Sequence, residues 1–128
     1  MDPGAVDVRC VIVDDNPGFL ITASKLLDRQ GLSIVAVATN SADALQCIQE
    51  QRPDVTLVDL KLGEESGFRL AEQIADGPVP SHVILTSTHS ESEYGELIAA
   101  SPVLGFIAKE HLSPQAIRRM VEAAGPPG

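Results

Sequence analysis

Aromatic residues are scarce in this sequence, and long apolar runs are missing. Phenylalanine, tyrosine and tryptophan make up 3% of the 128 residues, and tryptophan is absent. The core must therefore be aliphatic, and the sequence offers no row of rings on which single-stranded nucleic acid could stack. Every apolar stretch is far shorter than the roughly 20 residues of a transmembrane helix, and residues 1–7 contain no segment typical of a signal peptide. We therefore expect a cytoplasmic protein with no membrane partner.

Basic residues are also few. The 9 Lys and Arg residues are outnumbered by 18 Asp and Glu residues, which gives a net charge of −9. Binding to a nucleic-acid backbone needs clustered cations, so we expect no direct nucleic-acid partner. An acidic balance suits a basic partner or divalent cations, and it also keeps a small domain in solution.

Cysteine and histidine do not form any recognisable metal-binding pattern. Cys10 lies in an apolar run and Cys47 in a helical pattern, without a C-x-x-C spacing, so both are expected to be buried thiols. His82, His89 and His111 share no ligand spacing and are expected at the surface. A chain of this length needs neither a disulfide nor a structural metal to fold.

Apolar runs alternate regularly with helical patterns. Runs that predict buried strands lie at residues 8–13, 33–38, 55–60, 81–85 and 102–108. Helical patterns lie at residues 17–30, 41–52, 68–75, 90–100 and 114–124. Asn16-Pro17 and Ser113-Pro114 are typical helix starts, and Ser41 is expected to cap the second helix. Spacings of three and four predict one buried face for the first helix, made by Phe19, Leu20, Ala23, Leu26 and Leu27.

This alternation predicts an α/β fold built from right-handed βαβ units. We expect a doubly wound, five-stranded parallel sheet with five helices on both faces and the flavodoxin-like order 2-1-3-4-5. The predicted domain spans residues 8–124. Residues 1–7 are expected to be disordered, and residues 125–128 to form a flexible tail or the start of a linker.

Polar residues collect where the predicted strands end. Asp14 and Asp15 follow the first strand, Asp59 lies at the end of the third, Thr86 ends the fourth, and Lys109 follows the fifth. Each alone is also common in a turn or at a solvated strand end. In an open parallel sheet, however, ligands bind outside the carboxyl ends of the strands, so this ordered set predicts one shared site.

The three carboxylates need an explanation, because like charges in one site repel and raise each other's pKa. A divalent cation offsets that repulsion, and Mg²⁺ prefers a few carboxylates together with water and phosphate oxygens. Asp59 could then remain an ionised nucleophile toward phosphorus, since aspartyl-phosphate is an established covalent form. Such transfer depends mostly on positioning and charge neutralisation, which Thr86 and Lys109 could supply.

The sequence resembles the receiver domain of two-component response regulators over about residues 8–124. The residues that carry the resemblance are Val11-Ile12-Val13-Asp14-Asp15-Asn16, Leu57-Val58-Asp59-Leu60, Gly67-Phe68, Ile84-Leu85-Thr86-Ser87 and Gly105-Phe106-Ile107-Ala108-Lys109. The resemblance implies a phosphorylation-controlled switch that catalyses only its own phosphorylation and dephosphorylation and is not otherwise an enzyme. It implies Asp59 as the phosphoacceptor, with Mg²⁺ held by Asp14, Asp15, Asp59 and the backbone carbonyl of Lys61.

The resemblance also implies how the phosphoryl group would be sensed and passed on. Thr86 and Lys109 would contact it, and the ring of Phe106 would turn inward as Thr86 moves. The changing face would be the fourth helix, fifth strand and fifth helix, at residues 90–124. The implied partners are a sensor histidine kinase or phosphotransfer protein, which carries the donor histidine, and a downstream protein or a second copy of the chain.

Three departures from the family pattern lie in or beside the site. Receivers usually have Met-Pro where this chain has Leu62-Gly63, so the loop after Asp59 is expected to be more flexible. The cation of Lys61 could contact the phosphoryl group or compete with Mg²⁺. Glu110 stands where a proline commonly follows the lysine.

Two other functions fit parts of the pattern. A haloacid-dehalogenase-like phosphatase also uses an Asp nucleophile, but it needs Asp-x-Asp after the first strand, and Asn16 stands two positions after Asp14. A receiver-like protein-interaction module that no longer responds to phosphate would need none of the site residues. The intact set argues against it, and the departures around Lys61 and Gly63 argue for it.

Overall fold

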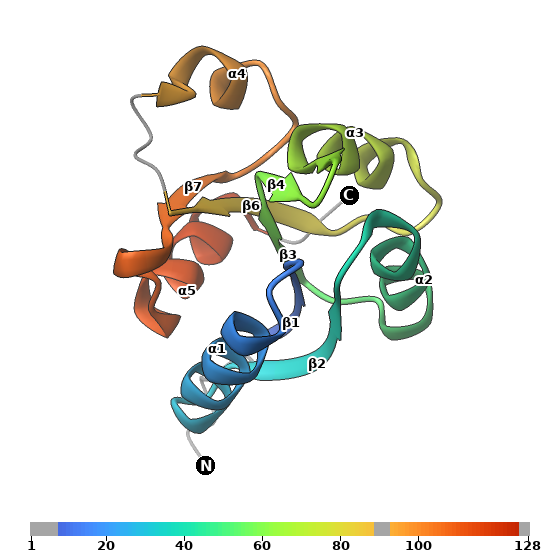
Figure 1. The fold of residues 1–128 in the computed structure, drawn as a ribbon. Coiled ribbons are helices and arrows are strands. Elements are labelled where there is room, and N and C mark those ends of the chain that lie inside the picture. The colour runs from blue at the N-terminus through green and yellow to red at the C-terminus, as the bar shows by residue number, and fades with distance from the viewer. Residues whose placement is uncertain (1–7, 89–92, 126–128) are drawn as a thin grey trace.

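The computed structural model describes residues 8–88 and 93–125 and arranges them as a central sheet with helices on both sides (Figure 1). The sheet contains β1 (Arg9–Val13), β2 (Ser33–Ala38), β3 (Val55–Asp59), β6 (His82–Ser87) and β7 (Gly105–Ala108). The helices are α1 (Pro17–Arg29), α2 (Ser41–Gln51), α3 (Gly67–Asp76), α4 (Gly95–Ala99) and α5 (Pro114–Ala124). Residues 1–7, 126–128 and His89, for which we made predictions, lie outside the described residues.

The sheet confirms the predicted topology. Within the described ranges its strands are parallel and run in the order β2-β1-β3-β6-β7, and β6 and β7 are the fourth and fifth predicted strands. The central strand β3 is buried along its whole length. That burial explains its nearly unbroken apolar sequence, because helices cover both faces of a parallel sheet.

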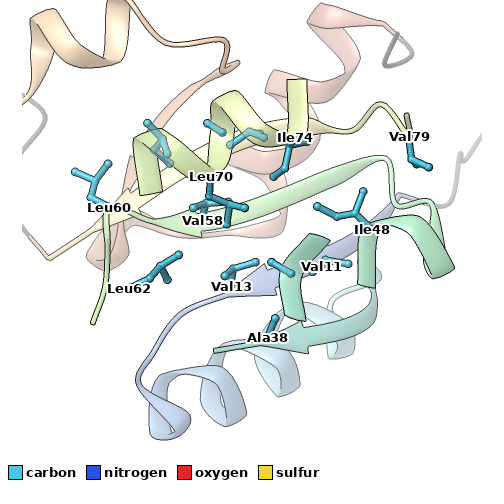
Figure 2. Close-up of a cluster of buried hydrophobic side chains, with 14 of the residues drawn as sticks. Val11, Val13, Ala38, Ile48, Val58, Leu60, Leu62, Leu70, Ile74 and Val79 are labelled. Carbon is cyan, nitrogen blue, oxygen red and sulfur yellow. The ribbon is translucent and has the colours of Figure 1, made fainter. Parts of the chain in front are cut away.

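Alternate residues along each strand feed two separate cores. In β1, Val11 and Val13 belong to the cluster that packs under α2, α3 and α4, which Figure 2 shows together with residues of β3. Cys10 and Ile12 point to the opposite face and pack with residues of α1 and α5. The two-residue period of a strand produces this division, and both cores end at the same carboxyl edge of the sheet.

The helix starts follow the expected chemistry with one correction. The Phe19 N–H donates to the Asn16 side chain at 3.2 Å, and the Ala116 N–H donates to the Ser113 hydroxyl at 3.1 Å. The N-cap of α2 is Asn40, whose side chain accepts the Asp43 N–H at 2.9 Å. The prediction of Ser41 as the N-cap was wrong by one residue. Asn and Ser are both good caps, and the two stand next to each other in the sequence.

Several expected burials and boundaries also differ. Leu26 is 44% exposed, because the narrow buried stripe of α1 consists of Leu20, Ala23 and Leu27. Cys10 is buried, which raises the pKa of its thiol to about 12, whereas Cys47 is only half-buried. The last strand begins at Gly105 instead of residue 102, consistent with a proline at 102, which has no N–H to pair. Residues 90–92 of the predicted fourth helix are not among those described.

The loop predicted after Asp59 contains a small antiparallel hairpin. Its strands are β4 (Lys61–Leu62) and β5 (Glu65–Ser66), in the register Lys61 with Ser66 and Leu62 with Glu65. Gly63, with φ of 64°, is the first residue of the two-residue turn, a conformation that glycine adopts without strain. Among the described residues, no helix has the length and apolarity needed to span a bilayer.

Candidate functional site

Three predicted carboxylates meet at the carboxyl edge of the sheet. Asp14 follows β1 and Asp59 ends β3, and these neighbouring strands pair in register, Val13 with Val58. Asp14, Asp15 and Asp59 each offer a carboxylate oxygen, and the three oxygens lie within 4.8 Å of one another. Asp14 is 1% exposed and Asp59 8%, whereas Asp15 is open to solvent.

Lys109 provides the positive charge that the predicted site requires. Its Nζ atom lies 2.6 Å from Asp14 Oδ2 and 3.2 Å from Asp59 Oδ2. It also lies 4.3 Å from the centre of the Phe19 ring, a distance at which a cation is attracted by the ring face. One ammonium group therefore links the ends of β1, β3 and β7 and partly offsets two buried negative charges.

Lys109 does not fully offset the negative charge of the buried carboxylates, and the pKa values of Asp59 and Lys109 reflect this. Burial, followed by the negative charge of Asp14, raises the pKa of Asp59 above its ordinary value of 3.8, while Lys109 and the Lys61 N–H oppose the rise. Burial alone would lower the pKa of Lys109, but its contacts with Asp14 and Asp59 raise it above 10.5. The cleft thus favours additional positive charge.

Backbone N–H groups orient all three carboxylates. The Asn16 N–H donates to Asp14 Oδ1 at 2.9 Å, and the Lys61 N–H donates to Asp59 Oδ1 at 3.3 Å. The Gly63 N–H donates to Asp15 Oδ2 at 2.9 Å. Two of these donors belong to the hairpin, so its position bears directly on the geometry of the acidic cluster.

The backbone around Asp59 requires glycine at the start of α3. A Cβ atom on Gly67 would lie 2.2 Å from the carbonyl oxygen of Asp59 and 2.9 Å from Leu60 Cα. The Gly67 N–H donates to the Leu60 carbonyl at 2.8 Å, and the Leu60 N–H donates to the Thr86 carbonyl at 2.9 Å. Close backbone packing therefore holds the end of β3 between α3 and β6.

Thr86, a predicted phosphoryl contact, and Phe106, the predicted switch residue, lie on β6 and β7 beside the strand that carries Asp59. Thr86 is paired with Asp59 in the register of β3 and β6 and is 2% exposed. Phe106 lies beside Leu85 in the next strand and is partly buried against the cluster under α3 and α4. Thr86 is therefore adjacent to the cleft, and Phe106 lies one strand further away. Their roles in a switch remain predictions.

The donor set fits Mg²⁺. This ion takes oxygen ligands at 2.0–2.1 Å, so opposite ligands are about 4 Å apart, and it commonly keeps one or two carboxylates with several waters. Oxygens within 4.8 Å of one another need only small side-chain rotations to share one ion. In a hairpin with a two-residue turn, the pair of residues one step beyond the turn-flanking pair points its N–H and C=O groups away from the partner strand. Lys61 and Ser66 form that pair here. The Lys61 carbonyl therefore lies on the same outer edge of the hairpin as the Lys61 N–H, which bonds to Asp59.

Sequence reasoning missed two contributors to this cleft. Phe19 fitted the apolar face of a helix, and nothing in its spacing indicated a contact with Lys109. The Gly63 N–H was missed because glycine there suggested only flexibility. The surface prediction for His82 also needs refinement, because its Nε2 lies 2.7 Å from the Gly125 carbonyl oxygen.

Comparison with known proteins agrees with this arrangement. The model of the response regulator receiver domain family matches residues 10–122. The solved structure of the signal receiver domain of NarL from Mycobacterium tuberculosis has a TM-score of 0.75 and 26% identity to this chain, and the match covers 94% of both chains. The chain therefore belongs to the receiver domain family of two-component response regulators.

Two relatives show how such a domain is used elsewhere. The transcriptional regulatory protein NarL of Mycobacterium tuberculosis is 27% identical over 124 residues, which cover 96% of this chain and 57% of NarL. A protein-glutamate methylesterase/protein-glutamine glutaminase of Natronomonas pharaonis is 30% identical over 84 residues, which cover 66% of this chain and 23% of that enzyme. The chain thus spans little more than half of the regulator and a smaller part of the enzyme.

These relatives bear on two earlier expectations. The expectation that nucleic acid is not a partner receives no support, because NarL is named as a transcriptional regulator. That expectation came from the −9 charge of this chain alone, which says nothing about a longer protein. The expectation that the chain is not otherwise an enzyme agrees with its similarity to a transcriptional regulatory protein, although the same similarity extends to part of a protein-glutamate methylesterase/protein-glutamine glutaminase.

Proposed function

We propose that this chain is a phosphorylation-controlled switch in which the Asp59 carboxylate accepts a phosphoryl group with the help of Mg²⁺. The position of Asp59 carries the proposal. Its carboxylate ends the central strand, shares a cleft with those of Asp14 and Asp15, and lies 3.2 Å from Lys109 Nζ. Membership of the receiver domain family supports the same function.

In the proposed reaction, an ionised Asp59 oxygen forms a bond to the phosphorus atom of a phosphodonor. The bond from phosphorus to the donor's leaving group breaks at the same time. With acetyl phosphate the leaving group is acetate, so no general base or acid is needed. Asp14, Asp15, Asp59 and the Lys61 carbonyl would hold Mg²⁺, which when bound supplies positive charge to the phosphoryl oxygens.

The other site residues would respond to the new group. Lys109, which now bridges Asp14 and Asp59, would pair with a phosphoryl oxygen, because that oxygen takes over the negative charge of the Asp59 carboxylate. The Thr86 hydroxyl would donate to another oxygen. Movement of Thr86 would leave space for the Phe106 ring, which is only partly buried, and so alter the face made by α4, β7 and α5.

The proposed partners lie at either end of this signal. A sensor histidine kinase or a phosphotransfer protein would supply the phosphoryl group. A downstream protein, or a second copy of the chain, would bind the altered face, where Leu97 of α4 is 55% exposed. If the chain works as part of a longer regulator of the NarL kind, contact with DNA would fall to residues that this match does not include.

Incubation with Mg²⁺ and acetyl phosphate, followed by intact-mass measurement, tests the proposal. We expect the wild-type protein to gain the mass of one phosphoryl group, and we expect neither Asp59→Asn nor a wild-type sample in EDTA to gain it. An equal gain on Asp59→Asn would place the modification elsewhere. An unmodified wild-type protein would leave the phosphate-independent interaction module as the better description.

A further inference from the structure

The β4–β5 hairpin is held by the buried side chain of Leu62 and by the Lys61 N–H bond to Asp59, and two further hydrogen bonds tie its turn and its second strand to other elements. On one side, the Gly63 N–H donates to Asp15 Oδ2 at 2.9 Å. On the other, Glu65 Oε1 accepts the Ser41 N–H at 3.0 Å. The hairpin therefore connects the acidic cluster to the N-terminus of α2.

The contact between Glu65 and Ser41 is chemically favourable. Ser41 is the first residue of α2, after the N-cap Asn40, and the N–H groups of a first helical turn have no partner within the helix. A carboxylate at this end also interacts favourably with the helix dipole. Glu65 is exposed, so its contact contributes hydrogen bonding and position but little burial of apolar surface.

The hairpin in turn determines two donors of the acidic cluster. It supplies the Gly63 N–H to Asp15 and the Lys61 N–H to Asp59. Groups that hydrogen-bond to metal ligands hold those ligands in orientation, and their loss commonly lowers metal affinity by 10- to 100-fold. A hairpin with only two-residue strands is too short to hold its place by pairing alone.

We propose that Glu65 is a positioning residue for cation binding: by fixing the hairpin to the N-terminus of α2, it keeps the Gly63 and Lys61 N–H groups on the acidic cluster. Glu65 is not one of the three carboxylates that form the acidic cluster. The inference rests on the proposed function in one respect, namely that the three carboxylates bind Mg²⁺.

Titration of the whole chain with Mg²⁺ alone, followed by NMR, tests this role without any phosphodonor. We expect Glu65→Ala to weaken Mg²⁺ binding about 3- to 10-fold, less than the loss of a direct partner of a metal ligand. Glu64→Ala is the matched control, because it removes the same charge from an exposed neighbour on the same hairpin. Glu65→Gln keeps an acceptor oxygen and should bind Mg²⁺ with close to wild-type affinity.

A second variant removes the other half of the same hydrogen bond. Ser41→Pro deletes the N–H that Glu65 accepts, at the helix position where proline is best tolerated, and Asn40 has the extended backbone that precedes proline. We expect Ser41→Pro to weaken Mg²⁺ binding about as much as Glu65→Ala. Because both changes break one contact, the double variant should be no weaker than either single variant.

Clear results would overturn the inference. Equal Mg²⁺ affinities for Glu65→Ala and Glu64→Ala would show that only charge matters, and additive losses in the double variant would show that Glu65 and Ser41 act separately. A wild-type protein without Mg²⁺ affinity would overturn it as well. Failure of the proposed function gives a different result. A chain that binds Mg²⁺ but takes no phosphoryl group from acetyl phosphate would refute phosphorylation. The titration would still decide the role of Glu65 in that case.

Discussion

At the scale of single residues, the site is dominated by one carboxylate in an unfavourable place. Asp59 is 8% exposed, and Asp14 adds a second buried negative charge beside it. Lys109 compensates both acids with one ammonium group. Such a site is stable only because several groups share the charge, and it gains from any cation or proton that enters. That gain is what a metal-assisted phosphoacceptor can use.

The raised pKa of Asp59 makes stability depend on pH. A carboxyl whose pKa is raised on folding favours the folded state at pH values below its unfolded pKa and loses that contribution as pH rises through its folded pKa. In EDTA at pH 7 we therefore expect Asp59→Asn to melt a few degrees higher than wild type, with the difference vanishing toward about pH 4.

Thermal melting followed by circular dichroism measures this difference. Glu64→Gln is the control, because it removes one negative charge from an exposed position and should leave the melting temperature almost unchanged. An Asp59→Asn variant that melts at or below the wild-type temperature at pH 7 would show that the ion pair with Lys109 outweighs burial and the charge of Asp14.

At the scale of elements, the site depends on how α3 meets β3. Helix α3 begins at Gly67, which touches the backbone of Asp59 so closely that a side chain has no room. The hairpin between them lies over the same edge and contributes N–H groups to Asp15 and Asp59. The geometry of Asp59 is therefore set by the connection between a strand and a helix.

Gly67→Ala should consequently damage both stability and cation binding. The added methyl group would meet backbone atoms that cannot rotate away, and overpacking of this kind costs about 1–3 kcal/mol. Gly95→Ala is the matched control, because a Cβ there would meet nothing within 4 Å. Urea denaturation and Mg²⁺ titration measure the two effects, and equal results for both variants would contradict the required close contact.

At the scale of the whole molecule, two cores share one sheet and end at one edge. The core under α2, α3 and α4 and the core under α1 and α5 draw on alternate residues of the same strands. Asp14, Asp59 and Lys109 lie at the ends of β1, β3 and β7, so a cation bound there connects strands that belong to both cores. Binding should therefore stabilise the domain as a unit.

Mg²⁺ should raise the free energy of unfolding by mass action. At a concentration 100 times its dissociation constant, a ligand that binds only the folded state contributes about 2.7 kcal/mol. We expect the urea midpoint to rise with Mg²⁺ and to rise much less with NaCl at the same ionic strength, which only screens charge. Identical midpoints in the two salts would show that the carboxylates do not form a specific cation site.

The sequence by itself determined the architecture and the chemistry of the cleft. Alternating strand and helix periods predicted a parallel α/β sheet, for which the flavodoxin-like fold supplied the expected strand order. The polar residues after the strands predicted which side chains would meet, because the carboxyl ends of parallel strands share one edge. Asp14, Asp15 and Asp59 do meet there, joined by Lys109. Local chemistry also located two of the helix starts, at Asn16 and Ser113.

Only the tertiary structure decided how these groups are held. Phe19 under Lys109, the Gly63 N–H on Asp15 and Glu65 on the first turn of α2 are contacts between segments 24 or more residues apart, and no local pattern specifies them. The exposure of Leu26 was likewise settled by packing, and only the structure shows that the Asn40 side chain accepts the Asp43 N–H. Helix and strand periods depend on repeated local preferences, whereas single contacts depend on where each segment finally lies.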